Sequence, residues 1–262
     1  MTGADADAGG GAAFPGVAFA ERGVYLSAAD ALVVADLHVG RAEASAVSLP
    51  LGERDDLLDR FGALLDRFDP ATTVVAGDVV HTFGRVTDRA LGTLNALREA
   101  CSDRGAAFEL VAGNHDTALA DAWNGTVREA YVVEEAAAVG GSGARIDAGD
   151  SETRTTAVCH GHEPPSVAAD RYVIGHVHPT IEIEGDRRPC FLRGAGTYRG
   201  ADVLLLPAFT RLAAGVPVND AATAGLDSPL VDAAADLAPI VYDGESGEAL
   251  RFPPLGELRE LL

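Results

Sequence analysis

All 7 histidines of this 262-residue chain follow short apolar runs in widely separated segments. An apolar run that stops abruptly at polar residues is typical of a buried strand that ends in a loop. The histidine segments are Asp36-Leu37-His38, Gly77-Asp78-Val79-Val80-His81, Gly113-Asn114-His115-Asp116, His160-Gly161-His162 and Gly175-His176-Val177-His178. Histidines that serve only packing or solubility would be scattered. Their confinement therefore predicts one shared site at the ends of several strands.

Between residues 31 and 114, apolar runs alternate with amphipathic segments. Strands are predicted at 31–35, 72–76 and 108–112, and helices at 51–68 and 88–104. The helical segments carry apolar residues at three- and four-residue spacing, which gives each helix one apolar face. This alternation predicts parallel strands with right-handed crossovers, and ligands gather beyond the carboxyl ends of such strands. Topology alone should therefore bring the first three histidine segments together.

The remaining segments are predicted to be rich in strands that form a second sheet packed against the first. Residues 19–26 form a strand before the turn at 27–30, residues 41–50 a polar loop, 116–124 a short helix, 131–139 a strand and 140–151 a glycine-rich turn. Further strands are expected at 155–159, 172–174, 180–184, 189–193 and 203–206. The stretch 219–238 is expected to form either a surface helix with loops or an interface element, and 240–251 a hairpin. We expect a flexible tail at 1–13 and a single domain from 14 to 262.

The ordered motifs Asp-x-His, Gly-Asp, Gly-Asn-His-Asp, His-Gly and Gly-His-x-His resemble those of the calcineurin-like metallophosphoesterase superfamily. The resemblance spans residues 36–178, and the ordered set is far more specific than any single motif. It implies an α/β fold, a four-layer sandwich of two mixed β-sheets flanked by helices. The segments 36–40 and 215–219 further resemble archaeal phosphoesterases related to the SbcD repair nuclease.

The resemblance implies two divalent metal ions that clamp a phosphoryl group and generate the attacking hydroxide. The first ion would bind Asp36, His38, Asp78 and His178; the second would bind Asp78, Asn114, His160 and His176. Asp78 would thus bridge the two ions. Imidazole and carboxylate ligands suit manganese, iron, zinc, cobalt or nickel, and we expect manganese to support activity in vitro.

His115 resembles the family's leaving-group acid and transition-state contact. In many members a carboxylate three residues after the aspartate of the second motif orients this histidine, but here that position is His81. Asp116 or a water could take over, or protonation of the leaving group matters less. His81 and His162 are expected beside the ligands, where they would contact phosphate or hold the ligands in place. The alternative for each is a buried histidine that bonds to the backbone.

The implied function is hydrolysis of phosphoester bonds, with a phosphodiesterase favoured. One alternative is a freestanding DNA or RNA nuclease of the SbcD-related type. A second is a binding scaffold that has lost catalysis, and the intact ligand positions argue against it. Arg41, Arg85, Arg193 and Arg199 are candidate phosphate contacts, with a plain surface role as the alternative. The sequence does not name the natural substrate.

The chain is strongly acidic, with a formal net charge of −20 from 40 acidic residues and 20 arginines. Nucleic-acid-binding proteins usually carry a basic face, so bulk charge does not indicate such a partner. We interpret the acidity as adaptation to a high-salt cytoplasm, as in haloarchaea, where salt screens repulsion. An ordinary acidic enzyme is the alternative. No apolar run approaches the ~20 residues of a membrane span, and no secretory signal is evident, so a cytoplasmic protein is expected. The oligomeric state stays open.

The excess of acidic residues predicts a fold that is stabilised by salt. Added ions screen the repulsion between exposed carboxylates, because the Debye length falls to ~3 Å at molar ionic strength. The melting temperature, measured by circular dichroism, should rise from dilute buffer to molar KCl. A flat or falling melting temperature would refute the high-salt interpretation.

Overall fold

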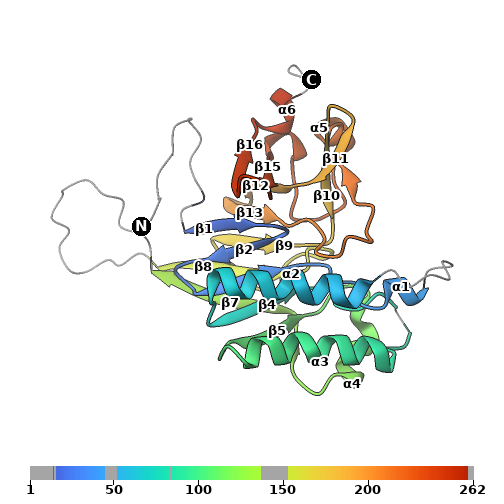
Figure 1. Cartoon of the computed structure of the whole chain (residues 1–262). Coiled ribbons are helices and arrows are strands. Elements are labelled where there is room, and N and C mark those ends of the chain that lie inside the picture. The colour runs from blue at the N-terminus through green and yellow to red at the C-terminus, as the bar shows by residue number, and fades with distance from the viewer. Residues whose placement is uncertain (1–13, 15, 45–51, 83, 137–152, 259–262) are drawn as a thin grey trace.

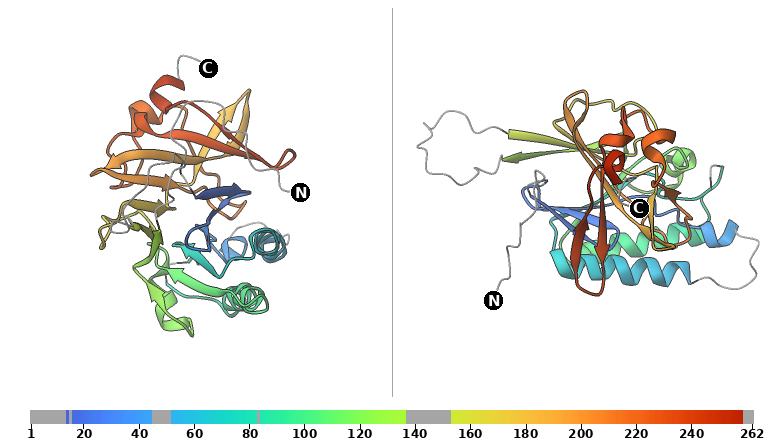
Figure 2. Two further views of the ribbon diagram at one scale, coloured as in Figure 1. Left: turned by 90° about the vertical axis from the view of Figure 1, so that its left-hand side faces the viewer. Right: turned by 90° about the horizontal axis from the view of Figure 1, so that it is seen from above.

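The computed structural model describes residues 14, 16–44, 52–82, 84–136 and 153–258. Two β-sheets pack face to face, two long helices cover the outer face of the first sheet, and short helices with a small third sheet cover the second (Figure 1). The side and top views show the same stacking (Figure 2). Within the described residues, no helix is both long and apolar enough to cross a membrane.

The first sheet has six strands. Their order is β1 (Val17–Ala20), β2 (Gly23–Leu26), β3 (Ala31–Val34), β4 (Thr72–Ala76), β5 (Ala107–Val111) and β6 (Val127–Arg128). Strands β3 to β6 are parallel, whereas β1, β2 and β3 pair antiparallel. Helices α2 (Glu53–Phe68) and α3 (Asp88–Ser102) form the crossovers. The predicted parallel unit is therefore confirmed.

Strand β3 shows why this sheet is buried on both faces. Leu32 and Val34 belong to the apolar cluster that includes Phe61 of α2 and Leu94 of α3. Val33, which points the opposite way, belongs to the cluster between the two sheets. A strand buried on both faces needs apolar residues at every position, which explains the unbroken apolar run in the sequence.

The second sheet has seven strands and is mixed. Their order is β16 (Glu248–Arg251), β15 (Ala238–Asp243), β12 (Phe191–Tyr198), β13 (Ala201–Leu205), β9 (Arg171–Ile174), β8 (Thr153–Cys159) and β7 (Ala130–Ala136). Strand β9 is parallel to β8 and β13, and the other pairs are antiparallel. The predicted sandwich of two mixed sheets is confirmed, and so is the C-terminal hairpin.

The outermost layer over the second sheet is built from short elements. They are β10 (Pro179–Ile183), β11 (Asp186–Pro189) and β14 (Val216–Pro217) of the third sheet, α5 (Ala221–Ala224), α6 (Leu255–Leu258) and a 3-10 turn at Ala234–Asp236. The sequence did not predict the third sheet. The stretch 219–238 is not one surface helix, because Ala221, Leu230 and Ala234 are buried in the core of this layer.

Other local predictions were wrong or lie outside the described residues. The run 19–26 is not one strand, because the chain turns at Glu21, with φ of 50°, and Arg22. Residues Arg41–Ala44 form a short helix, α1, within the expected loop. The predicted helix at 116–124 is a 3-10 turn, Asp116–Ala118, followed by α4 (Leu119–Ala122). Predictions for 1–13, 45–51 and 137–152 fall outside the described part, and the single domain stays a prediction.

The loops after the central strands are joined by backbone hydrogen bonds. The N–H of Asp36 donates to Gly77 O at 3.1 Å, and that of His38 donates to Asp78 O at 2.8 Å. In the second sheet, the N–H of Gly175 donates to His160 O at 3.1 Å. The fold therefore fixes the histidine segments of each sheet relative to one another at the strand ends.

Candidate metal centre

One half of the site is formed by Asp36, His38, Asp78 and His178. The Nε2 atoms of His38 and His178 are 3.4 Å apart. His178 Nε2 lies 3.3 Å from Asp36 Oδ1, and His38 Nε2 lies 3.6 Å from Asp78 Oδ2. Ring nitrogens and carboxylate oxygens that face one another at such distances leave room for a shared cation at their centre.

The other half is formed around His160. Its Nε2 lies 3.0 Å from Asn114 Oδ1 and 3.4 Å from Asp78 Oδ1. The ring of His176 is 4.9 Å from that of His160, measured between centroids. Asp78 thus presents Oδ2 to His38 and Oδ1 to His160, which is the geometry that a bridging carboxylate requires. The structure brings together all seven residues that the sequence predicts as ligands.

Most of these imidazoles are held neutral, the form that binds metals. Burial lowers the pKa of His38 to about 2, helped by the charges of the neighbouring histidines and Arg41. Burial also lowers the pKa of His160 to about 4, against the charge of Asp78. For His178, burial would lower the pKa, but the hydrogen bond and charge of Asp36 outweigh it and raise the pKa. Within the described residues, the buried Nδ1 of His38 has no hydrogen-bond partner. The imidazole and carboxylate donors of the cluster are the ligand types that suit a transition metal.

The backbone at these positions is strained. Asp36, His38, Asp78, His176 and His178 have φ between 43° and 67°, in the left-handed region. They make up half of the non-glycine residues with positive φ in the described ranges. Each such conformation costs roughly 1–3 kcal/mol and tends to cluster at functional sites. The strain therefore marks the same residues as the side-chain geometry does.

Two glycines allow the loops to approach closely. Gly77 has φ of +77°, and a Cβ there would lie 2.3 Å from Nδ1 of His160. A Cβ on Gly113 would lie 2.2 Å from the backbone nitrogen of Asp78 and 2.3 Å from its Oδ1. Since real Cβ atoms do not come this close, any side chain at either position must displace a candidate ligand.

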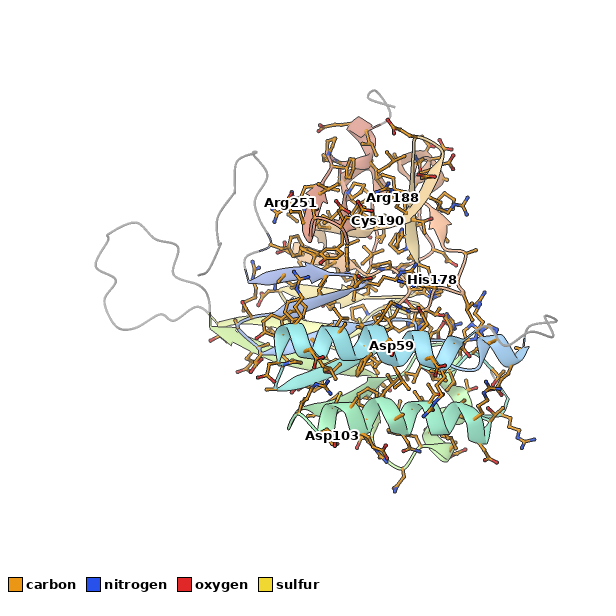
Figure 3. All side chains as sticks on the ribbon, in the orientation of Figure 1. Asp59, Asp103, His178, Arg188, Cys190 and Arg251 are labelled. Carbon is orange, nitrogen blue, oxygen red and sulfur yellow. The ribbon has the colours of Figure 1, made fainter. Side chains whose placement is uncertain are left out.

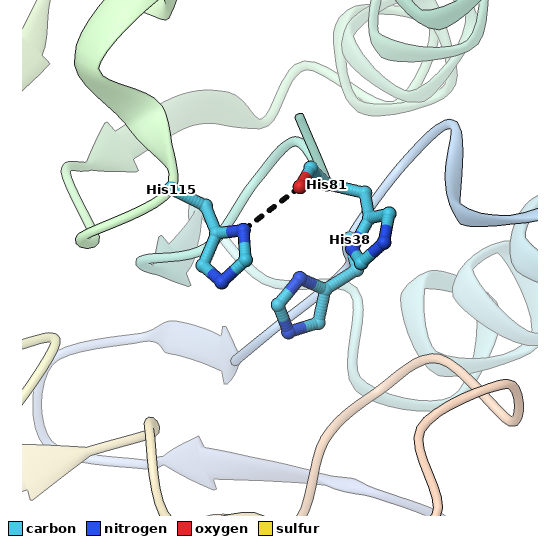
Figure 4. A group of neighbouring side chains, drawn as sticks. All are labelled: His38, His81 and His115. Atoms are coloured by element: carbon cyan, nitrogen blue, oxygen red, sulfur yellow. Dashed lines mark hydrogen bonds between the residues drawn. The ribbon is translucent and has the colours of Figure 1, made fainter. Parts of the chain in front are cut away.

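His115 is oriented by a backbone carbonyl. Its Nδ1 lies 2.8 Å from the carbonyl oxygen of His81, as the dashed line in Figure 4 shows. A carbonyl only accepts hydrogen bonds, so Nδ1 carries the proton, and Nε2 lies 3.8 Å from Asp78 Oδ2. The ring of His81 stacks on that of His115, with centroids 5.7 Å apart. Sequence reasoning looked for a side chain at position 81 and missed this contact, because a carbonyl leaves no residue-specific signal.

Asp116 holds two loops together. Its carboxylate accepts hydrogen bonds from the N–H groups of Gly113 at 2.8 Å, Val79 at 3.1 Å and Val80 at 3.0 Å. Burial raises the pKa of Asp116 to about 6, although these donors favour its charged form. Its oxygens are thus engaged with the backbone around Asp78 and Asn114. Asp116 therefore fixes the backbone of the two loops that carry Asp78 and Asn114.

His162 and Arg41 lie beside the cluster. The ring of His162 is 5.0 Å from that of His160 and 6.0 Å from that of His176. Burial lowers the pKa of His81, and the charge of Arg41 lowers it further. The N–H of Arg41 donates to the carbonyl oxygen of His38 at 3.1 Å, so the backbone of Arg41 contacts a candidate ligand.

Comparison with known proteins agrees with this geometry. Residues 30–205 match the model of the calcineurin-like phosphoesterase family. The chain belongs to this family. Members typically bind two divalent metal ions, and the described histidines and aspartates form groups that could hold them. No curated protein matches the chain.

Solved structures that match the chain include a nuclease and a phosphoesterase. A nuclease, MPE, from Pseudomonas putida has 21% sequence identity and a TM-score of 0.55, over 88% of this chain and 92% of that one. The phosphoesterase Yfce from E. coli has 14% identity and a TM-score of 0.40, over 84% of this chain and 96% of that one. At such identities, the first likeness shows a shared fold and nothing about the substrate.

Gly113→Ala should reduce metal binding without unfolding the protein. The added Cβ would push on the backbone nitrogen and Oδ1 of Asp78, and Asp78 faces both halves of the site. We expect manganese content, measured by mass spectrometry after dialysis, to fall from near two ions per chain to one or none. Gly62→Ala is the control, because no atom of the described residues beyond its own helix backbone and chain neighbours lies within 4 Å of a Cβ there. Full manganese content in Gly113→Ala would contradict this account of the site.

Proposed function

We propose that this chain hydrolyses phosphodiesters with two divalent transition-metal ions, and that manganese supports the activity. The observation that carries the proposal is the position of Asp78, whose two oxygens face His38 at 3.6 Å and His160 at 3.4 Å. We assign Asp36, His38, Asp78 and His178 to one ion, and Asp78, Asn114, His160 and His176 to the other. Membership in the calcineurin-like phosphoesterase family supports hydrolysis of phosphoester bonds.

When bound, such ions polarise the phosphoryl oxygens and lower the pKa of a bound water. The chain's own residues would hold the ions and determine where the phosphoryl group lies. Asp78 and Asp36 are buried, so their charges act in a medium that screens them weakly. His115 reaches toward the same space, because its Nε2 lies 3.8 Å from Asp78 Oδ2. We assign His115 to the leaving group and not to either ion.

The contact with the carbonyl of His81 determines how His115 would work. Nδ1–H is used in that hydrogen bond at 2.8 Å, so a proton for the leaving oxygen must be carried at Nε2. The carbonyl orients the ring, as a carboxylate would, without contributing a full negative charge. The role of His115 as proton donor therefore survives the absence of an acid at position 81.

A nuclease is the second candidate. The similar structure from Pseudomonas putida is described as a nuclease, and we place this chain with the SbcD-related archaeal phosphoesterases on its motifs. The net charge of −20 opposes binding of a long polyanion in dilute salt. A direct comparison of plasmid DNA with a small phosphodiester, in the same metal and salt, separates the two candidates.

Manganese-dependent hydrolysis of bis(4-nitrophenyl) phosphate tests the proposed function. Wild-type protein should release nitrophenolate with manganese, and a chelator should abolish the activity. Asp78→Ala should be inactive and metal-poor, because both halves of the site lose a ligand. Asp59→Ala on the exposed side of α2 is the matched control. Wild-type protein that holds two ions per chain and hydrolyses no phosphoester would instead be a binding scaffold.

His115→Ala should slow the reaction while keeping the metals. Loss of a general acid typically costs ~10²–10⁴-fold in rate. The loss should be largest for an alkoxide leaving group, such as a nucleoside, and much smaller for nitrophenolate, which departs without a proton. Steady-state rates on both ester types, with metal analysis of the same samples, check this. Equal losses on the two esters would mean that His115 stabilises the phosphoryl oxygens instead.

A further inference from the structure

A cavity of about 150 Å³ reaches the candidate metal centre at His178. It lies between the small third sheet and the loop 207–215, and its walls include Arg22, Thr180, Arg187 and Gly215. A single buried water needs only roughly 10–15 Å³, so this cavity is large enough for a polyatomic group. None of its other lining residues belongs to the predicted metal ligands.

One wall of the cavity is formed by Thr180, which is 8% exposed. Its Oγ1 is shielded from solvent and has no hydrogen-bond partner among the described residues, so the hydroxyl does not open into the cavity. A Cβ at Gly215 would lie 2.4 Å from Cγ2 of Thr180 and 2.8 Å from the carbonyl oxygen of His178. Any side chain at position 215 would therefore displace Thr180 and change the shape of this wall of the cavity.

The cavity is also cationic. Arg22 is anchored, because its Nη1 donates to the carbonyl oxygens of Ala208 at 2.9 Å and Thr210 at 2.6 Å. Burial lowers the pKa of Arg22 to about 10, so it remains charged at neutral pH. Arg187 belongs to strand β11 and pairs across the ladder with Glu182 of β10, and its side chain makes no hydrogen bond or ion pair with the described residues. Within the described part of the chain, the cavity is thus lined by two arginines and by no acidic residue, in a chain of net charge −20.

A second cavity, of about 260 Å³, reaches the cluster at His160 and His162 and has the opposite character. Its walls include the carboxylates of Glu129 and Glu163. Carboxylates repel phosphate groups, whereas guanidinium groups bind them with charge-assisted hydrogen bonds. A phosphate group on one side of a phosphodiester would therefore be attracted by the cavity lined with arginines. On the other side it would be repelled by the cavity lined with carboxylates.

We propose that the substrate carries a second phosphate group, which binds in the cavity between Arg22, Thr180 and Arg187 beside His178. This inference rests on the proposed hydrolysis of phosphodiesters and narrows the substrate class to esters with more than one phosphate, such as short oligonucleotides. The guanidinium groups of Arg22 and Arg187 neutralise the charge of this phosphate. The part of the substrate on the other side of the scissile phosphate carries no phosphate and lies toward Glu129 and Glu163.

Three dinucleotides that differ only in a terminal phosphate test the subsite. Dithymidine monophosphate has the scissile phosphate alone, and its 5′-phosphorylated and 3′-phosphorylated forms each carry one more. At the lowest salt that keeps the protein folded, kcat/KM should be about tenfold higher for one phosphorylated form, through a lower KM. This is the order expected for one charge-assisted hydrogen bond. Equal kcat/KM for all three dinucleotides would overturn the proposal.

Arg187→Gln should bring this ratio of kcat/KM values close to one, and Arg187→Lys should restore part of it. The control is Arg188→Gln, which removes the same charge from the next residue of β11, on the opposite face of the strand. Arg188 does not line the cavity, and it lies farther from helices α2 and α3 than His178 does (Figure 3). Loss of the ratio in Arg188→Gln as in Arg187→Gln would mean a diffuse charge effect and no subsite.

Binding measurements separate this inference from the proposed function. Calorimetric titration of the manganese-loaded His115→Ala variant should show about tenfold tighter binding of a phosphorylated dinucleotide than of dithymidine monophosphate. Combining Arg187→Gln with His115→Ala should remove this difference in affinity between the two dinucleotides. If no dinucleotide is hydrolysed but the binding difference persists, the proposed function fails and the subsite stands. Hydrolysis without any difference in binding or KM overturns the subsite alone.

Discussion

The buried carboxylate of Asp36 is the contact on which the arrangement of the two sheets around the site depends. Its Oδ2 accepts a hydrogen bond from the N–H of His176 at 3.0 Å, across the interface between the sheets. Its backbone carbonyl accepts the N–H of Thr210 at 3.3 Å, and its own N–H donates to Gly77. A fully buried charge is unfavourable unless it is paired and hydrogen-bonded. The packing of the sheets and the arrangement of the candidate metal centre are therefore coupled, because both depend on hydrogen bonds to Asp36.

Features that repeat along the chain could be predicted from the sequence, whereas features that depend on single backbone groups could not. Phe61 and Leu94 belong to periodic apolar faces, and such faces predict helices well because burial constrains every turn. The motifs around Asp78 and His160 likewise predicted the convergence of ligands. In contrast, the two central residues of the turn between β1 and β2, Glu21 and Arg22, are not typical turn residues, and strand β14 (Val216–Pro217) pairs through only two residues.

The net charge of this protein is strongly negative, whereas the described side chains that line the cavity beside His178 include two arginines and no acidic residue. An excess of acidic residues governs solubility and long-range repulsion, yet it says little about a cavity a few ångströms wide. Arg60 illustrates the local rule, because it bonds to Asp56 at 2.7 Å and lies 4.3 Å from the centroid of the Phe209 ring. Arg22 instead bonds to neutral carbonyl oxygens, and Asp56 and Glu21 offset its charge only in part, because the pKa of Arg22 remains below its ordinary value. An acidic chain can thus keep a cationic surface where an anion would be bound.

The left-handed backbone at the candidate ligands has an evolutionary consequence. At Asp36, His38, Asp78, His176 and His178, glycine would relax a positive φ and at the same time remove a donor atom. Selection for a stable fold and selection for metal binding therefore act in opposite directions on the same codons. Asp36 differs from the other four positions, because glycine there would also remove the carboxylate that holds His176 at 3.0 Å. The five positions therefore combine a strained backbone with a donor side chain, and no single substitution at them can relieve the strain and keep the ligand.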